Sequence, residues 1–169
     1  MWTLAVGLVA WAGWLWPDIP AHVPTHFGAD GEPDAWAARS VWSWFGLPAA
    51  GLFVAAVVDA AVVWTHHHPA LAGLNLPQKD AILALPPERR APVLARSAEM
   101  AYGAGALCLV AFALIHLGAW TAARGADGAG WVMAGVMVAA VGPLVALVWG
   151  LSRVSAEVRR QQGGRSASA

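Results

Sequence analysis

Long uncharged stretches alternate with short polar segments along this chain. No Asp, Glu, Lys or Arg occurs in residues 1–16, 41–58, 100–123 or 128–152, and the second stretch continues to residue 65 with Asp59 as its only charge. About 20 apolar residues in a helix cross the ~30 Å core of a bilayer. The pattern therefore predicts an all-α integral membrane protein with four transmembrane helices, at about residues 1–16, 41–65, 100–123 and 128–152.

The first stretch is the shortest of the four. Its 16 residues reach roughly 24 Å as a helix. Tryptophan suits the headgroup region and would anchor such a helix across a thinned bilayer, and this stretch contains Trp2, Trp11, Trp14 and Trp16. Bulky tryptophan also fills the zone where a signal peptide would be cleaved, so we expect a retained first helix.

The segments between the spans differ in character. Residues 17–40 contain Pro17, Pro20, Pro24 and Pro33, and proline cannot continue a helix, so we expect an ordered, non-helical Pro/Gly-rich loop. In the larger loop 66–99, residues 74–85 predict a short amphipathic helix and a second helical piece begins at Pro87. After a transmembrane domain of residues 1–152, the basic segment 153–169 predicts a disordered tail.

The distribution of Lys and Arg indicates the orientation. Eight of the ten lie in residues 66–99 and 153–169, whereas Arg39 and Arg124 fall in the other two polar segments. Because cytoplasmic loops are enriched in Lys and Arg, we expect both ends of the chain and loop 66–99 in the cytoplasm, and loop 17–40 outside. The net charge is zero, without the basic stripe that nucleic-acid binding requires.

Loop 17–40 carries a compact motif: Pro17-Asp-Ile-Pro20, then Thr25-His-Phe-Gly28, then Gly31-x-Pro-Asp34-x-Trp36. This motif resembles the signature of a bacterial membrane domain family of unknown function, which forms the N-terminal part of the SdpI-like (sporulation-delaying-protein immunity) membrane proteins. The resemblance implies a small protein of the bacterial cytoplasmic membrane that protects the cell from a secreted toxic peptide and signals to a cytoplasmic regulator. The ligand-binding residues would then be Asp18, His26, Phe27, Gly31, Asp34 and Trp36, with the regulator at loop 66–99.

A second interpretation starts from the histidines. Imidazole and carboxylate groups bind zinc and other divalent metals, and His22 and His26 lie near Asp18 and Asp34 in sequence. His116 lies about five residues from the outer end of the third predicted span, where an ionisable residue is a functional candidate. His22, His26 and His116 would hold one divalent metal in a hydrolase-like membrane enzyme. Alternatively, the loop is a rigid cap and His116 bonds a neighbouring helix.

Other features leave further alternatives open. Asp59 lies inside the second span and would pair with Tyr102, or lie near Arg96 and Glu99. Small residues in the spans favour close helix contacts and a homodimer. No familiar catalytic signature is present, and a short apolar chain of this kind also fits an accessory subunit of a transporter.

Overall fold

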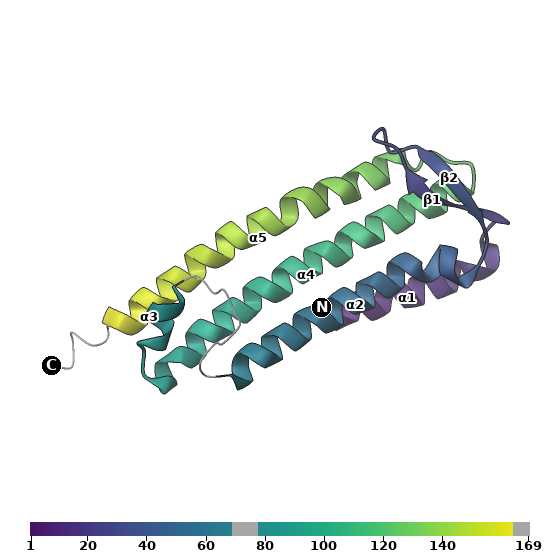
Figure 1. Cartoon of the computed structure of the whole chain (residues 1–169). Helices are drawn as coiled ribbons and strands as arrows, with labels where there is room; N and C mark the ends of the chain where they lie inside the picture. Colours follow the sequence, from purple (N-terminus) through teal and green to yellow (C-terminus); the bar gives the residue numbers. More distant parts are fainter. Residues whose placement is uncertain (69–77, 164–169) are drawn as a thin grey trace. The chain divides into compact units, whose positions relative to one another are not determined.

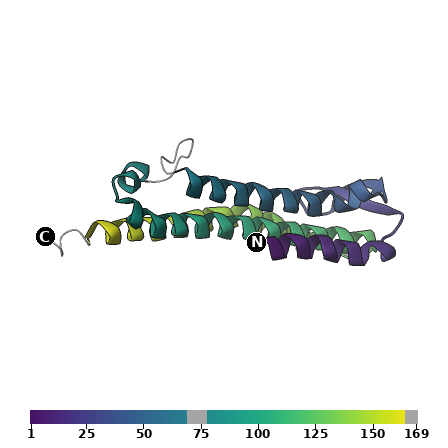
Figure 2. The ribbon, with the colours of Figure 1, turned by 90° about the horizontal axis from the view of Figure 1, so that it is seen from below.

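The computed structural model describes residues 1–68 and 78–163 and is mostly helical (Figures 1 and 2). The elements follow in the order α1 (Trp2–Leu15), the 3₁₀ turn η1 (Trp16–Asp18), β1 (His22–Phe27), β2 (Pro33–Ala38), α2 (Val41–His67), α3 (Lys79–Leu83), α4 (Pro87–Ala123) and α5 (Ala129–Gly163). The strands pair antiparallel as a hairpin.

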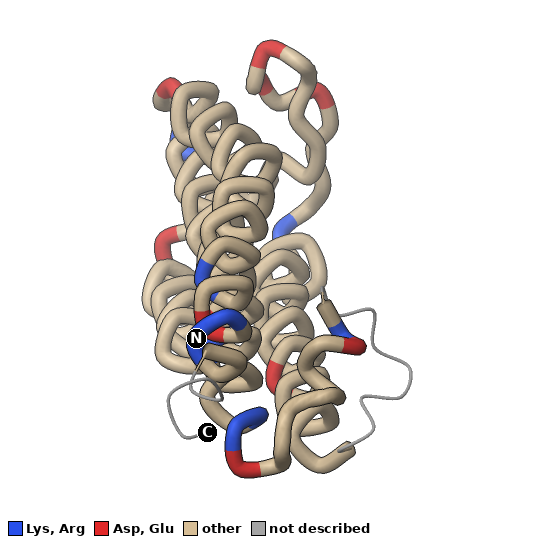
Figure 3. Tube along the Cα trace, turned by 90° about the vertical axis from the view of Figure 1, so that its left-hand side faces the viewer, with Lys and Arg blue, Asp and Glu red and all other residues tan. Residues whose placement is uncertain are grey.

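Within the described residues, α2, α4 and α5 are long and apolar enough to cross a membrane. Figure 3 shows long stretches of the trace without charged residues. Large apolar side chains on α5 are exposed, Leu144 at 63% and Val148 at 69%, as expected for a helix that faces lipid. The chain is therefore a multi-pass membrane protein. Helix α1, with 14 residues, is shorter than these three helices. That α1 is a further membrane span therefore stays a prediction.

The chain divides into two compact units, residues 1–56 with 105–143 and residues 57–104 with 144–169. In the first unit, α1 buries Ala5, Leu8, Ala12 and Leu15, a spacing of three or four that places them on one helix face. Close approach of α4 and α5 depends on small residues, because a Cβ at Gly135 would lie 2.8 Å from the Ala111 carbonyl oxygen.

The second unit has its own apolar core of Ile82, Leu85, Val93, Val154 and Val158. The prediction of a disordered tail from residue 153 is wrong up to Gly163, because α5 continues to that residue. Val154 and Val158 are one turn apart and both 2% exposed, so burial of this apolar pair holds the basic segment in the helix. Residues 164–169 of the predicted tail lie outside the described residues.

The polar loops are also more regular than expected. The prediction of an ordered, non-helical segment agrees with the hairpin, but the all-α prediction is wrong there, because Pro24 and Pro33 lie within strands. An edge strand tolerates proline because only one side of its backbone is paired. The helix predicted at residues 74–85 is observed as the shorter α3, and residues 69–77 lie outside the described residues. The piece predicted to begin at Pro87 is continuous with the third span as α4.

Candidate functional site

The hairpin turn is fixed by local hydrogen bonds and packs against α5. The Gly28 N–H donates to the Glu32 carbonyl at 2.8 Å, and the Glu32 N–H donates to Asp30 Oδ1 at 3.0 Å. Gly31 has a φ of +83°, which favours glycine. A Cβ there would also lie 2.9 Å from the carbonyl oxygen of Ala129, at the start of α5. Gly31 is therefore required both for the turn and for the contact.

The base of the hairpin is closed by Arg39. Its guanidinium donates to the Ile19 carbonyl at 2.8 Å and lies 4.9 Å from the centre of the Trp16 ring. Helix α2 then begins with a reciprocal cap, in which the Ser43 N–H donates to Ser40 Oγ at 3.0 Å and the Ser40 N–H donates to Ser43 Oγ at 2.9 Å. Such a cap satisfies donors that the first turn of a helix leaves unpaired.

His26 and Asp34 meet across the hairpin, at 2.5 Å between Nδ1 and Oδ1. A carboxylate only accepts hydrogen bonds, so the imidazole donates from Nδ1. Both side chains are largely exposed, at 70% and 51%, so the pair contributes little to stability. It orients the imidazole and leaves Nε2 available to a ligand.

Beneath the hairpin, Trp44 joins α2 to α1. Its Nε1 donates to the Ala12 carbonyl at 2.9 Å. This acceptor is available because the Trp16 N–H, its usual helical partner, instead bonds Gly13 as α1 ends. Trp44 is 2% exposed and packs in one cluster with Ala12, Leu15, Ile19 and Val23. The hairpin thus rests on a core shared by α1 and α2.

His116 of α4 is enclosed by this aromatic core. Its ring centre lies 4.1 Å from that of Trp44 and 5.5 Å from that of Trp11, edge-on to the latter. The residue is 3% exposed, and within the described residues its Nε2 has no hydrogen-bond partner. One turn further along α4, the buried Nε1 of Trp120 also has none there. Such unpartnered groups cost about 1–3 kcal/mol each when buried.

A cavity of about 320 Å³ opens at His116 between β1, α2 and α4. We call it the hairpin pocket; its walls include Pro24, Thr25, Phe27, Trp42, Trp44 and His116. Its walls are mainly apolar and aromatic, with the Thr25 and Ser43 hydroxyls and His116 as polar groups. Apolar walls with a few polar groups that fix orientation are typical of ligand-binding pockets.

The predicted site residues are only partly brought together. Phe27 lines the hairpin pocket, Gly31 packs on α5, and His26 meets Asp34. Trp36 is 49% exposed on β2, and Asp18 and His22 are exposed in η1 and at the start of β1. Across residues 1–68 and 78–163, no group of three or more His, Cys, Asp or Glu could hold a metal ion. His22, His26 and His116 are thus not gathered into such a group in this structure.

The comparisons with known proteins concern the same region. Residues 3–52 match a family model described as "Domain of unknown function (DUF1648)". The matched region contains nearly all of α1, the hairpin and the start of α2, whereas His116 lies outside it. No curated protein and no solved structure matches the chain. The match is to a domain family of unknown function, as expected from the sequence, and it assigns no activity.

The second unit contains the other predicted polar pair. The Tyr102 hydroxyl donates to Asp59 Oδ1 at 2.9 Å, which is the first of the two partners that the sequence suggested. Arg96 instead binds Glu99 through both carboxylate oxygens, at 2.7 and 2.9 Å. Asp59 is thus satisfied by a hydroxyl within the helices.

Sequence reasoning missed the aromatic residues around His116. The role predicted for Trp11 is that of an interfacial anchor, and the sequence does not single out Trp42 or Trp44. One signal was available: Trp11 lies three residues after Leu8 and four before Leu15, so it falls near the apolar face of its helix. The contact of Trp44 with His116 joins residues 72 positions apart, which no local pattern indicates.

Proposed function

We propose that the protein recognises a secreted peptide at the outer end of its helices and protects the cell from it, as the SdpI-like proteins do. The observation that carries this proposal is the hairpin pocket with the buried Nε2 of His116, which has no hydrogen-bond partner among the described residues. A ligand group that pairs with Nε2 would remove the cost of leaving it unsatisfied. A hydrogen bond from the ligand to His116 would therefore favour binding of a peptide that can form it.

A peptide fits this surface in two ways. The aromatic wall of the pocket suits an apolar side chain. Among the described residues each hairpin strand has one partner strand, so its other edge is available to an extended backbone, as in recognition by strand addition. The oriented imidazole of His26 and the half-exposed Trp36 lie on the same hairpin.

In the proposed topology α1 crosses the membrane in addition to α2, α4 and α5, and the hairpin lies on the outer side. The eight Lys and Arg of residues 66–99 and 153–169, against two elsewhere, support this orientation. The buried face of α1, with Ala5 and Ala12 at 0% exposure, supports its packing with the other helices. A cytoplasmic regulator would contact residues 66–99, of which 69–77 lie outside the described residues. The exposed face of α5 would meet lipid or a second copy.

A growth assay tests this function. Bacteria that lack the protein would express wild type, His116→Leu or the control Arg124→Gln, and would be challenged with secreted apolar toxic peptides. We expect wild type and the control to raise the inhibitory concentration of at least one peptide, and His116→Leu to lose most of this protection. Equal sensitivity of cells with and without the wild-type protein would contradict the proposal.

A further inference from the structure

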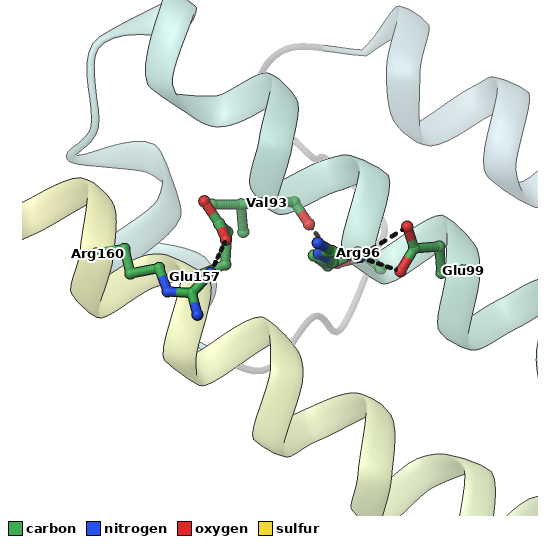
Figure 4. Close-up of polar contacts among 6 residues, drawn as sticks. Val93, Arg96, Glu99, Glu157 and Arg160 are labelled. Carbon is green, nitrogen blue, oxygen red and sulfur yellow. Dashed lines mark hydrogen bonds and ion pairs between the residues drawn. The ribbon is translucent and has the colours of Figure 1, made fainter.

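A second cavity, with polar walls, lies in the other unit and shares no residue with the hairpin pocket. It has a volume of about 460 Å³ and is lined by Arg96, Ser152, Arg153, Ala156, Glu157 and Arg160. We call it the arginine pocket. Figure 4 shows Arg160 beside Glu157 on α5 and Arg96 beside Glu99 on α4.

The charges of this pocket favour an anion. Arg96 is balanced by Glu99, and Arg160 approaches Glu157 only at 3.7 Å. The Glu157 side chain is 11% exposed and accepts a 2.7 Å hydrogen bond from Gln161, so it is held in place. Arg153 stacks 4.2 Å from the centre of the Trp149 ring, and in the described residues it forms no ion pair. The three arginines therefore outnumber the two carboxylates, and the side chains at the pocket have a net charge of +1.

The position of the pocket along its helices indicates the source of the anion. Arg153 is the first charged residue after the uncharged stretch 128–152, and Glu99 is the last before the uncharged stretch 100–123. Both helices therefore leave their apolar stretches at this pocket, the level at which lipid headgroups lie. The exposed Leu144 and Val148 precede it on α5 and offer a surface to acyl chains.

We propose that the arginine pocket binds the phosphate of an anionic glycerophospholipid, with the acyl chains along the exposed face of α5. Guanidinium groups match phosphate oxygens through paired hydrogen bonds, and basic pockets between membrane helices bind lipid headgroups. The site is independent of peptide recognition at the hairpin pocket. The lipid site predicts that the protein binds anionic lipid selectively, which the peptide proposal does not predict.

Native mass spectrometry of the full-length protein, released from micelles with equal phosphatidylglycerol and phosphatidylcholine, tests this site. We expect preferential retention of phosphatidylglycerol. Affinity should fall about fivefold for each arginine removed, which corresponds to roughly 1 kcal/mol, in Arg153→Gln and in Arg153→Gln/Arg160→Gln. Arg124→Gln is the matched control, because Arg124 likewise stacks on a tryptophan, at 5.1 Å from the ring centre of Trp120. It should retain the lipid.

Three results would overturn the proposal: equal retention of both lipids, an equal loss in Arg124→Gln, or full displacement of the lipid by inorganic phosphate, which would indicate a site for a free anion. If the double variant does not fold, Arg160→Glu tests the same claim, because this side chain is 74% exposed. Reversal of its charge should abolish the preference for phosphatidylglycerol, and an unchanged preference would contradict the site.

Discussion

The hairpin pocket and the arginine pocket are both lined by α4, yet their chemistry is opposite. The first surrounds His116, which is 3% exposed between two tryptophans. The second contains Arg96 on the same helix, paired with Glu99 at the edge of an uncharged stretch. In the first pocket a polar group is buried and has no partner among the described residues. In the second the arginines reach the surface and two of them lie beside carboxylates, of which Glu157 is buried.

This difference separates two uses of polar residues in a membrane protein. A buried, unpartnered group costs stability, and a ligand that pairs with it restores what is lost. Exposed guanidinium groups cost little and act through their field on anions at the membrane surface. Stability should therefore depend strongly on the aromatic core of the first unit and weakly on its polar groups.

The largest effect is expected from Trp44→Ala. This change removes a side chain that is 2% exposed, together with its bond to the Ala12 carbonyl. The free energy of unfolding should fall by about 3–5 kcal/mol, measured by denaturant titration in detergent. Trp42→Ala is the control, because Trp42 is 87% exposed and its loss should cost under about 0.5 kcal/mol. Equal effects of the two changes would contradict the burial of Trp44 in the aromatic core.

Gly31→Val should have the next largest effect. The φ of +83° disfavours a β-branched residue, and the Cβ would press on the Ala129 carbonyl. We expect a loss of about 1–3 kcal/mol in the same titration. At Gly46 of α2 a Cβ meets nothing within 4 Å, so Gly46→Ala should stabilise the helix by about 0.5–1 kcal/mol. A neutral Gly31→Val would argue against docking of the turn on α5.

Tyr102→Phe tests the polar contact of the second unit. Loss of the 2.9 Å bond to Asp59 should lower the free energy of unfolding by about 0.5–1.5 kcal/mol. A double-mutant cycle with Asp59→Asn measures the pair directly, and the effects of the two changes should not add. Strict additivity would mean that the two side chains do not interact.

Apart from the control variants, the smallest loss of stability is expected for His116→Leu, although His116 is among the most buried polar residues. Replacement of an unpartnered imidazole by an apolar side chain should change the free energy of unfolding by less than about 1 kcal/mol, or raise it. Thermal and denaturant unfolding of the variant provide the measurement. A loss of several kcal/mol would instead assign His116 a structural role.

The sequence predicted the helices better than the segments between them. Span 41–65 corresponds closely to Val41–His67, because Ser40 begins a helix whose interior is apolar. The hairpin was missed because Pro24 and Pro33 argue against strands, and only pairing between two edge strands accommodates them. The helical tail was missed because its charges hid the one-turn spacing of Val154 and Val158.

The candidate site was predicted only in outline. The sequence placed His116 on the same side as the motif loop, and the structure places it in one pocket with Phe27. Its surroundings follow from contacts between distant residues, such as Trp11 and His116. The three histidines predicted to hold a metal are not gathered in the described residues, because proximity in sequence and a shared depth in the membrane do not determine where side chains converge.

The most direct test of the central claim is a binding titration in detergent with a peptide that gives protection in the growth assay. Tryptophan emission of wild type and His116→Leu would be followed, since Trp42 and Trp44 line the hairpin pocket. We predict saturable binding to wild type and about five- to tenfold weaker binding to the variant, as expected for one lost hydrogen bond. Equal affinities in two folded proteins would contradict recognition through His116.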